Sequence, residues 1–266
     1  MKPPLSETSL ADLRERFLVQ GDPCSPQTLG RLRQDPRKGV QALAEQLARR
    51  SARARAENRR MDDLLAFERE RWGKGIIRIA GTDEVGVGPL AGPVVAAAVI
   101  LPPDVRVEGV NDSKQLRPEQ REALSLEIRE RAVTFAFGEA SLEEIERINI
   151  RNAGFLAMRR ALEALSPEPE LVVIDAHRLD GLPWPQEPVI KADASIHCVA
   201  CASVLAKVHR DAYMVEMDRL YPGYGFAEHK GYGCPSHLDA LKRLGPSPIH
   251  RAGFHWAGRQ LSLFGD

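Results

Sequence analysis

Four acidic residues stand at or just past the ends of apolar, strand-like runs: Asp83, Glu84, Asp175 and Asp193. In an open α/β sheet, ligand sites form at the strand ends, and carboxylates gathered there repel one another unless a divalent cation neutralises them. Hard oxygen ligands favour Mg²⁺ or Mn²⁺ over zinc. The pattern leaves two interpretations open: one shared divalent-metal site, or four unrelated loop carboxylates.

A glycine-rich segment, residues 85–88, follows the first acidic pair directly. Neighbouring residues on a regular strand point to opposite faces, so we expect a chain break at Gly86 to let Asp83 and Glu84 share one site. Glycines also allow a substrate backbone to approach closely, and exposed amides can bind a hydroxyl or a phosphate. The glycine spacing up to Gly92 does not match a dinucleotide-binding fingerprint, so we favour a polynucleotide over a nucleotide cofactor.

The elements that must position these residues alternate between strand and helix. Apolar runs predict strands at residues 76–80, 94–101, 132–137, 171–174 and 189–190, and helical periodicity predicts helices at 118–131, 141–165 and 196–220. The first two strands are expected to form a hairpin. The alternation predicts an α/β core.

The composition excludes several classes of protein. The 266 residues are 43% hydrophobic and 28% charged, which argues for one substantial core and against a disordered or fibrous chain. Lys plus Arg and Asp plus Glu each number 37, so the net charge gives no indication of a nucleic-acid partner. The longest strongly apolar stretch, residues 90–101, is too short and too interrupted for a membrane helix. With no apolar secretory segment and four scattered cysteines, the expected location is the cytoplasm.

Residues 1–72 differ from the rest of the chain and are expected to form a separate helical extension. They are rich in arginine, and residues 49–60 alone hold six arginines against Glu57. Apolar residues recur at helical spacing on either side of that stretch, which predicts one or two amphipathic helices. The arginines have two interpretations, a solvated helix face or an auxiliary contact with nucleic acid.

Several blocks, in this order, resemble the bacterial type 2 ribonuclease H family. They are AGTDEVG at 80–86, PLAGPVVAAAV at 89–99, NDSK at 111–114, VIDA at 173–176, KAD at 191–193, AKV at 206–208, RD at 210–211 and HKGYG at 229–233. The resemblance covers residues 73–256, and several members of the family carry an N-terminal helical extension similar to residues 1–72.

The resemblance implies an RNase H-like mixed sheet flanked by helices, with residues 73–266 as the catalytic domain and a C-terminal helical part that completes the substrate groove. It implies a metal-dependent endonuclease, expected to be a monomer, that cuts the RNA strand of RNA–DNA hybrids. It also implies nicking of duplex DNA 5′ to an embedded ribonucleotide, leaving 3′-hydroxyl and 5′-phosphate ends. By motif, the four carboxylates are the catalytic and Mg²⁺- or Mn²⁺-binding residues.

The family recognises the RNA–DNA junction with a Gly-Arg-Gly loop and a tyrosine. The matching positions here are Gly86, Val87, Gly88 and Tyr232, so the arginine is absent. Glycine backbone groups can still contact a 2′-hydroxyl, but a valine cannot supply a charge directed at phosphate. We expect intact metal binding with weaker substrate binding or an altered junction preference. The alternative is a catalytically weakened module that binds hybrids.

Other matched positions carry less specific expectations. Lys114 is expected to contact phosphate, with an ordinary solvated lysine as the alternative, and Lys207 either contacts phosphate or pairs with a neighbouring carboxylate. Ala192 stands where the family commonly has glycine, which matters only if that position needs a positive φ. His229 either positions the groove loop or makes a structural hydrogen bond.

One cysteine pair invites a zinc or redox interpretation. Cys198 and Cys201 form a Cys-x-x-Cys motif preceded by His197. The pair falls inside a predicted helix and lacks a second ligand pair at suitable spacing, so small buried helix residues are the favoured explanation.

Overall fold

The computed structural model of the chain describes residues 5, 7–252, 255–256 and 259–260. The chain divides into two compact units, Met1–Asp62 and Asp63–Asp266. Helix α3 (Lys38–Trp72) contributes residues to both. Among the described residues, no helix combines the length and the apolar character that crossing a membrane requires.

The first unit is helical, as the sequence predicts. It contains α1 (Leu10–Arg14), a π-helical turn (Glu15–Val19), α2 (Pro26–Arg33) and the first part of α3. Its buried core consists of Leu13, Phe17, Leu32, Val40, Leu43, Ala44 and Leu47. The arginine-rich stretch 49–60 does not separate two helices but lies inside the continuous α3, where most of its side chains are exposed.

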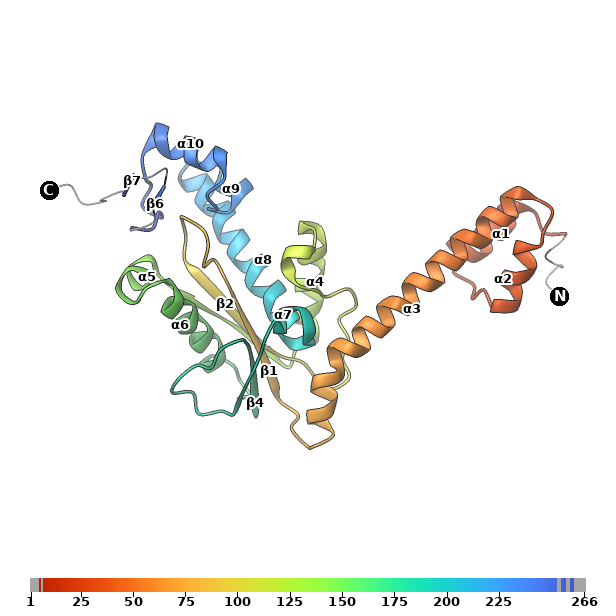
Figure 1. Cartoon of the computed structure of the whole chain (residues 1–266), viewed down its shortest axis with the longest axis horizontal. Coiled ribbons are helices and arrows are strands. Elements are labelled where there is room, and N and C mark those ends of the chain that lie inside the picture. Colours follow the sequence, from red (N-terminus) through yellow and green to blue (C-terminus); the bar gives the residue numbers. More distant parts are fainter. Residues whose placement is uncertain (1–4, 6, 253–254, 257–258, 261–266) are drawn as a thin grey trace. The chain divides into compact units, whose positions relative to one another are not determined.

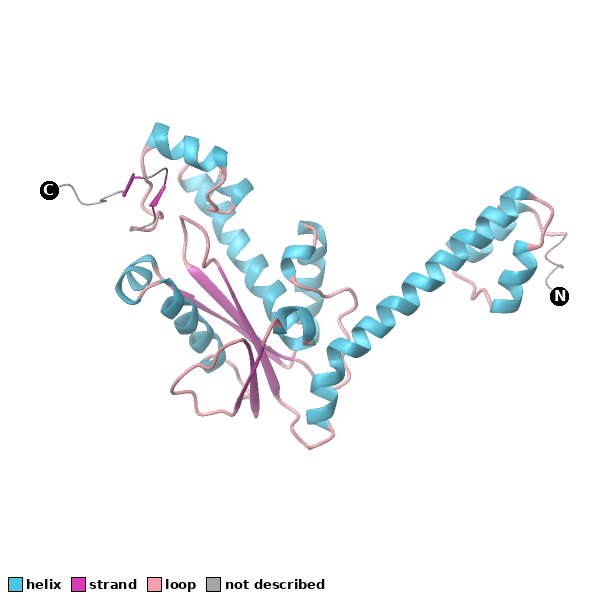
Figure 2. Cartoon of the chain, viewed as in Figure 1, coloured by secondary structure: helices cyan, strands magenta, loops and turns pink. Residues whose placement is uncertain are grey.

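The second unit is built on a five-stranded mixed sheet. Its strands are β1 (Ile79–Val85), β2 (Val94–Ile100), β3 (Thr134–Ala140), β4 (Leu171–Asp175) and β5 (Gln186–Val189). They are ordered β3-β2-β1-β4-β5. Figure 2 shows the strands of the sheet in magenta. The β1–β2 and β2–β3 pairs are antiparallel, whereas β1–β4 and β4–β5 are parallel. The predicted hairpin and the predicted RNase H-like mixed sheet are therefore confirmed.

Helices cover both faces of this sheet (Figure 1). Helix α6 (Ile150–Glu163) packs on one face against β1, β2 and β3, and α8 (His197–Leu220) packs on the other against β1 and β2. Helix α4 (Pro118–Arg131) packs against α8. The remaining elements are a 3₁₀ turn (Ser113–Gln115), α5 (Leu142–Ile148), α7 (Ala192–Ser195), α9 (Phe226–His229), α10 (Pro235–Leu244), and the short strands β6 (His255–Trp256) and β7 (Arg259–Gln260).

Several boundaries differ from the sequence prediction. The strand expected over 76–80 runs from Ile79 to Val85, and the one expected over 189–190 runs from Gln186 to Val189. The helical region expected over 141–165 is interrupted at Asn149, whose φ of 67° ends α5 and whose side chain caps α6. The strand expected over 132–137 runs from Thr134 to Ala140, because its pairing with β2 continues up to Val94.

The last turns of α3 belong to the second unit rather than to the first. Phe67 and Trp72 pack against a buried cluster formed by β1, β4, α7 and α8. The buried carboxylate of Glu68 accepts a hydrogen bond of 2.8 Å from the backbone N–H of Cys198, in the first turn of α8. A carboxylate at this position also interacts favourably with the positive end of the helix dipole.

Gly81 allows α8 to lie unusually close to the sheet. A Cβ atom at this position would lie 2.6 Å from the carbonyl oxygen of Cys198 and 2.5 Å from the nitrogen of Val199. Because both neighbours are helix backbone, they cannot move aside as a flexible side chain would. The absence of a side chain at residue 81 thus sets the distance between β1 and α8.

We expect Gly81→Ala to lower the free energy of unfolding of the second unit by about 1–3 kcal/mol, because the added methyl group forces α8 away from the sheet. Gly73→Ala is the matched control, since a Cβ there makes only ordinary contacts of 3.5 Å. Urea unfolding followed by tryptophan fluorescence measures both, because Trp72, Trp184 and Trp256 all fall in the second unit. Equal stability of the two variants would contradict the packing argument.

Candidate active site

The parallel pairing of β1 with β4 brings two of the predicted carboxylates to the same edge of the sheet. The register pairs Thr82 with Ile174, and its continuation places Asp83 beside Asp175. Asp193 comes from α7, just after β5, and the backbone N–H of Ala192 donates a 3.3 Å hydrogen bond to Oδ1 of Asp175. Three segments far apart in sequence therefore meet at this edge.

Asp83 and Glu84 lie inside β1 rather than past its end, paired with Ala97 and Ala96 of β2. They occupy opposite faces of the sheet, as regular strand alternation requires. Gly81 contacts α8, so Asp83 also lies on the α8 side, whereas Cγ of Glu84 lies toward α6 near Gly154. The expectation that a chain break at Gly86 orients this acidic pair is wrong, because pairing with β2 keeps the strand regular through both residues.

Electrostatics nevertheless couples the carboxylates. Burial is the main cause that raises the pKa of Asp83 to about 8, and the charges of Glu84 and Asp193 raise it further. Ser203 of α8 has the opposite effect and lowers this pKa. Burial followed by the charge of Asp175 raises the pKa of Glu84. Asp83 therefore keeps its proton at neutral pH when no metal is bound, and its ionisation is coupled to that of carboxylates on both faces of the sheet.

Asp193 has its own charged neighbours. Burial, followed by the charge of Asp112, raises its pKa. The ammonium group of Lys114 lies 3.8 Å from an oxygen of Asp193 and 3.8 Å from one of Asp112. Partial burial works against the charge on Lys114, but Asp112, Asp193 and Asp83 together raise its pKa. With 80% of its side chain exposed, this lysine is a cation at the mouth of the site.

The residues fit a hard divalent cation in charge and in donor type. All four predicted ligands offer carboxylate oxygens. Burial is the main cause of the raised pKa values of Asp83, Glu84 and Asp193 and neighbouring carboxylates add to it, so a bound cation would favour the ionised forms. Within the described residues, no three His, Cys, Asp or Glu side chains are already gathered in ligating geometry. The metal site therefore stays a prediction supported by electrostatics.

The glycine-rich loop begins directly after β1 and leads into β2. Gly86 has a φ of 95°, and a Cβ there would lie 2.7 Å from the carbonyl oxygen of Pro93, so only glycine is accommodated. Val87 and Gly88 are exposed beyond it. Tyr232 lies next to this loop, since a Cβ on Gly88 would be 3.6 Å from Cε1 of its ring. The predicted glycine and tyrosine elements are neighbours in space.

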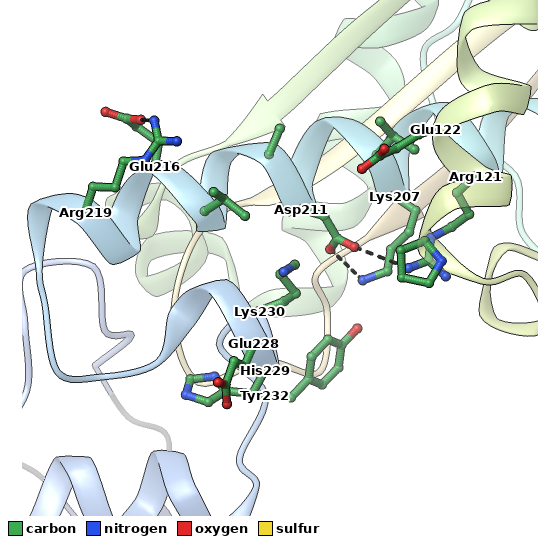
Figure 3. Close-up of a pocket in the computed structure, with 14 residues that line it drawn as sticks. Arg121, Glu122, Lys207, Asp211, Glu216, Arg219, Glu228, His229, Lys230 and Tyr232 are labelled. Atoms are coloured by element: carbon green, nitrogen blue, oxygen red, sulfur yellow. Dashed lines mark hydrogen bonds and ion pairs between the residues drawn. The ribbon is translucent and has the colours of Figure 1, made fainter.

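Tyr232 also borders a groove of about 640 Å³ between α4, α8 and α9 (Figure 3). Dashed lines in Figure 3 join Asp211 to Lys207 at 2.6 Å and to Arg121 at 3.7 Å. Lys207 therefore pairs with a neighbouring carboxylate, the second of its two predicted roles. Its ammonium group lies 5.9 Å from the centre of the Tyr232 ring.

Three other expectations are resolved by local geometry. His229 makes structural hydrogen bonds, since its Nε2 lies 2.8 Å from the carbonyl oxygen of Tyr224 and its Nδ1 accepts from the N–H of Gly231. Ala192 is fully buried, and the left-handed φ of 57° belongs to Lys191, so the alanine is tolerated. Cys198 and Cys201 are buried within α8, as the favoured explanation required.

Sequence patterns did not single out Ser203, Asp112, Arg210 or Arg251 as contributors to the site. Ser203 lies in an alanine-rich helix, Asp112 belongs to the NDSK block and Arg210 to the RD block. The burial of Arg210 is visible only in the structure. None of the four has a spacing that identifies its partner.

Comparison with known proteins identifies the family of the chain. The family model for ribonuclease HII matches residues 80–257, and the model for the ribonuclease HII N-terminal domain matches residues 9–72. Ribonuclease HII of Anaeromyxobacter sp. strain Fw109-5 is 47% identical over 97% of this chain and 82% of its own length. That of Myxococcus xanthus is 48% identical over 94% of this chain and 86% of its own length.

Two solved structures share the fold. The ribonuclease H2 of Pyrococcus horikoshii OT3 has a TM-score of 0.57 and 26% identity, with coverage of 67% of this chain and 94% of that chain. The ribonuclease HII in a complex with PCNA from Archaeoglobus fulgidus has a TM-score of 0.56 and 26% identity, with coverage of 70% and 98%.

The raised pKa of Asp83 predicts a specific pH dependence of stability. The folded protein holds this proton more tightly than the unfolded chain does, so without divalent metal its stability falls as the pH rises from about 4 to 8. Asp83→Asn removes this loss. We expect the variant to be more stable than the parent at pH 8 by at least about 1 kcal/mol, and to differ little from it at pH 4.

Chemical denaturation in EDTA across this pH range tests the expectation. Asp239→Asn, at an exposed position in α10, is the control and should keep the parental pH dependence. A parental slope in Asp83→Asn would show that Asp83 ionises normally in the folded protein.

Proposed function

The chain belongs to the ribonuclease HII family of endonucleases, which act on the RNA of RNA–DNA hybrids, and on that premise we propose that it also nicks duplex DNA 5′ to an embedded ribonucleotide. The proposed products carry 3′-hydroxyl and 5′-phosphate ends. In the cell, this activity would serve the removal of ribonucleotides incorporated into DNA and of RNA primers.

The observation that carries the proposal is the convergence of β1, β4 and α7, which brings their carboxylates to one edge of the sheet; the raised pKa values of Asp83, Glu84 and Asp193 accord with it. In the proposed enzyme, Asp83, Glu84, Asp175 and Asp193 bind Mg²⁺ or Mn²⁺. Divalent ions held there would activate water and stabilise the charge that develops on the phosphate and the leaving 3′-oxygen. No covalent intermediate with the protein is needed.

The chain's own residues supply orientation and charge around that centre. Ser203 of α8 lies beside Asp83 and favours its ionised form, and its hydroxyl donates a 3.0 Å hydrogen bond to Oγ of Ser113 in the 3₁₀ turn. Lys114, exposed and 3.8 Å from Asp193, is placed to attract a phosphate of the substrate toward the carboxylates. Because its pKa is raised, Lys114 is fully protonated at neutral pH.

The proposed substrate contacts lie on the exposed loop next to the carboxylates. Backbone groups of Gly86, Val87 and Gly88 contact the 2′-hydroxyl of the ribonucleotide, and Tyr232 stacks on the adjoining sugar. The neighbouring positions of Gly88 and Tyr232 support this division of roles. Neither contact involves the side chain at residue 87, where valine carries no positive charge.

We assign the catalytic role to residues 73–266 and propose that residues 1–72 form the accessory extension; residues 253–254, 257–258 and 261–266 of the catalytic range lie outside the described structure. We propose in addition that the enzyme acts as a monomer. We also propose a cytoplasmic location, which the four unpaired cysteines support.

Cleavage of a DNA duplex with one ribonucleotide tests the proposed activity. With Mg²⁺ or Mn²⁺, we expect a single nick 5′ to the ribonucleotide, and we expect Asp83→Asn to lower its rate by at least about a thousandfold, because a metal ligand is lost. Asp239→Asn should cut like the parent. End-labelled strands resolved on a denaturing gel measure the rate and the position of the nick.

Binding of the duplex without a nick under either metal would contradict the proposal. It would favour the alternative, a module that binds hybrids without cutting them. A nick that persists in Asp83→Asn would instead move the catalytic centre away from these carboxylates.

A second prediction concerns residue 87, whose valine is 38% exposed. Val87→Arg adds a cation beside the substrate path, so we expect the affinity for the ribonucleotide-containing duplex to rise about two- to tenfold and the salt dependence to steepen by about one phosphate contact. Val87→Met adds length without charge and should gain less. Fluorescence anisotropy at several salt concentrations measures both variants, and unchanged affinity and rate in Val87→Arg would contradict the expectation.

A further inference from the structure

The guanidinium of Arg251 reaches the glycine-rich loop from a segment far along the chain. Its side chain is 4% exposed. It donates hydrogen bonds to the carbonyl oxygens of Gly86 (2.5 Å), Pro89 (2.8 Å), Gly92 (2.8 Å), Val87 (3.3 Å) and Pro93 (3.3 Å). The backbone N–H of Arg251 also donates to the carbonyl of Leu90 at 3.0 Å. One side chain therefore gathers most of the loop between β1 and β2.

Arg210 of α8 binds the same loop through other carbonyl groups. Its fully buried guanidinium donates to the carbonyl oxygens of Ala91 (2.8 Å), Pro93 (3.1 Å) and Lys230 (3.0 Å). The bond to Lys230 ties the loop to the segment that carries Tyr232. Burial, followed by the charge of Arg210, lowers the pKa of Arg251 to about 9, so both side chains remain cationic at neutral pH.

Two buried cations close together are costly, and the cost is offset only when hydrogen bonds satisfy their N–H groups. A leucine or methionine could fill the same space without this penalty. The arrangement therefore has to be explained by what the guanidinium groups do to the loop.

The direction of the carbonyl groups decides where the loop amides point. In a trans peptide, the C=O and the following N–H are directed oppositely. Because the carbonyls of Gly86 and Val87 point inward to Arg251, the N–H groups of Val87 and Gly88 point away from it. Both residues are exposed, and within the described part of the chain neither N–H donates a hydrogen bond. The loop thus presents two free donors in succession.

We propose that Arg251 is a positioning residue, which turns the loop carbonyls inward so that the N–H groups of Val87 and Gly88 face the sugar–phosphate of the substrate. The inference rests on the proposed function and adds the residue that shapes its recognition loop. Arg251 touches no reacting atom. Its contribution is to discriminate a ribonucleotide from a deoxyribonucleotide, since two aligned donors recognise a 2′-hydroxyl.

Arg251→Lys tests this role, because lysine keeps the charge but cannot reach five carbonyls from one nitrogen. The measurement is the affinity of the full chain, in EDTA, for two duplexes of one sequence that differ only in a single ribonucleotide. We expect the ratio of the two affinities to fall at least about tenfold in Arg251→Lys, through weaker binding of the ribonucleotide-containing duplex. Arg243→Lys, in the exposed part of α10, should keep the parental ratio.

A folded Arg251→Lys protein with the parental ratio of affinities would overturn the inference. It would not contradict the proposed nicking activity. Equal affinity of the parent for both duplexes would overturn the proposed ribonucleotide recognition, and the inference with it. A merely structural role would weaken binding of both duplexes alike and leave the ratio unchanged.

Hydrogen exchange on the unaltered protein gives a second test that does not depend on the variant folding. The amides of Val87 and Gly88 should exchange rapidly in the free protein and slow at least about tenfold with the ribonucleotide-containing duplex. The all-DNA duplex should protect them less. Slow exchange in the free protein, or equal protection by both duplexes, would overturn the inference.

Discussion

Repulsion between carboxylates at one edge of a sheet is the constraint on which the second unit depends. Left to themselves, side chains such as Asp83 and Glu84 would separate, and the fold holds them in place through backbone pairing with β2 on one side and β4 on the other. The close approach of α8 at Gly81 brings Ser203 to Asp83, and the 3₁₀ turn brings Lys114 to Asp193. A divalent cation bound at this edge would relieve that repulsion.

The recognition side of the site is held by a different kind of interaction. Arg210 and Arg251 bind main-chain carbonyls, so the shape of the loop depends on backbone geometry rather than on the loop's own side chains. The hydrogen bonds that hold the loop therefore do not involve the side chain at residue 87. The carboxylates attract charge and the arginines impose shape, and the two functions are carried by separate elements of one unit.

The sequence predicts the elements well where a local signal is strong. The apolar run of β2 reads as a buried strand because both of its faces are covered, and the capping box of Ser141 and Glu144 marks the start of α5. The break at Asn149 has no comparable signal, since its left-handed backbone depends on the packing of two helices. The roles of Arg210 and Arg251 cannot be predicted from the sequence, because their partners in the glycine-rich loop lie more than a hundred residues away along the chain.

That separation also orders events during synthesis. Gly86 leaves the ribosome 165 residues before Arg251, an interval of roughly 8–33 s at ordinary elongation rates of about 5–20 residues per second. The strands and α6 can pair and pack in that interval, and Arg210 can bind the carbonyls of Ala91 and Pro93 before synthesis ends. The carbonyls of Gly86 and Val87 have no guanidinium partner until Arg251 has been added, so the first part of the loop is the last to acquire its hydrogen bonds.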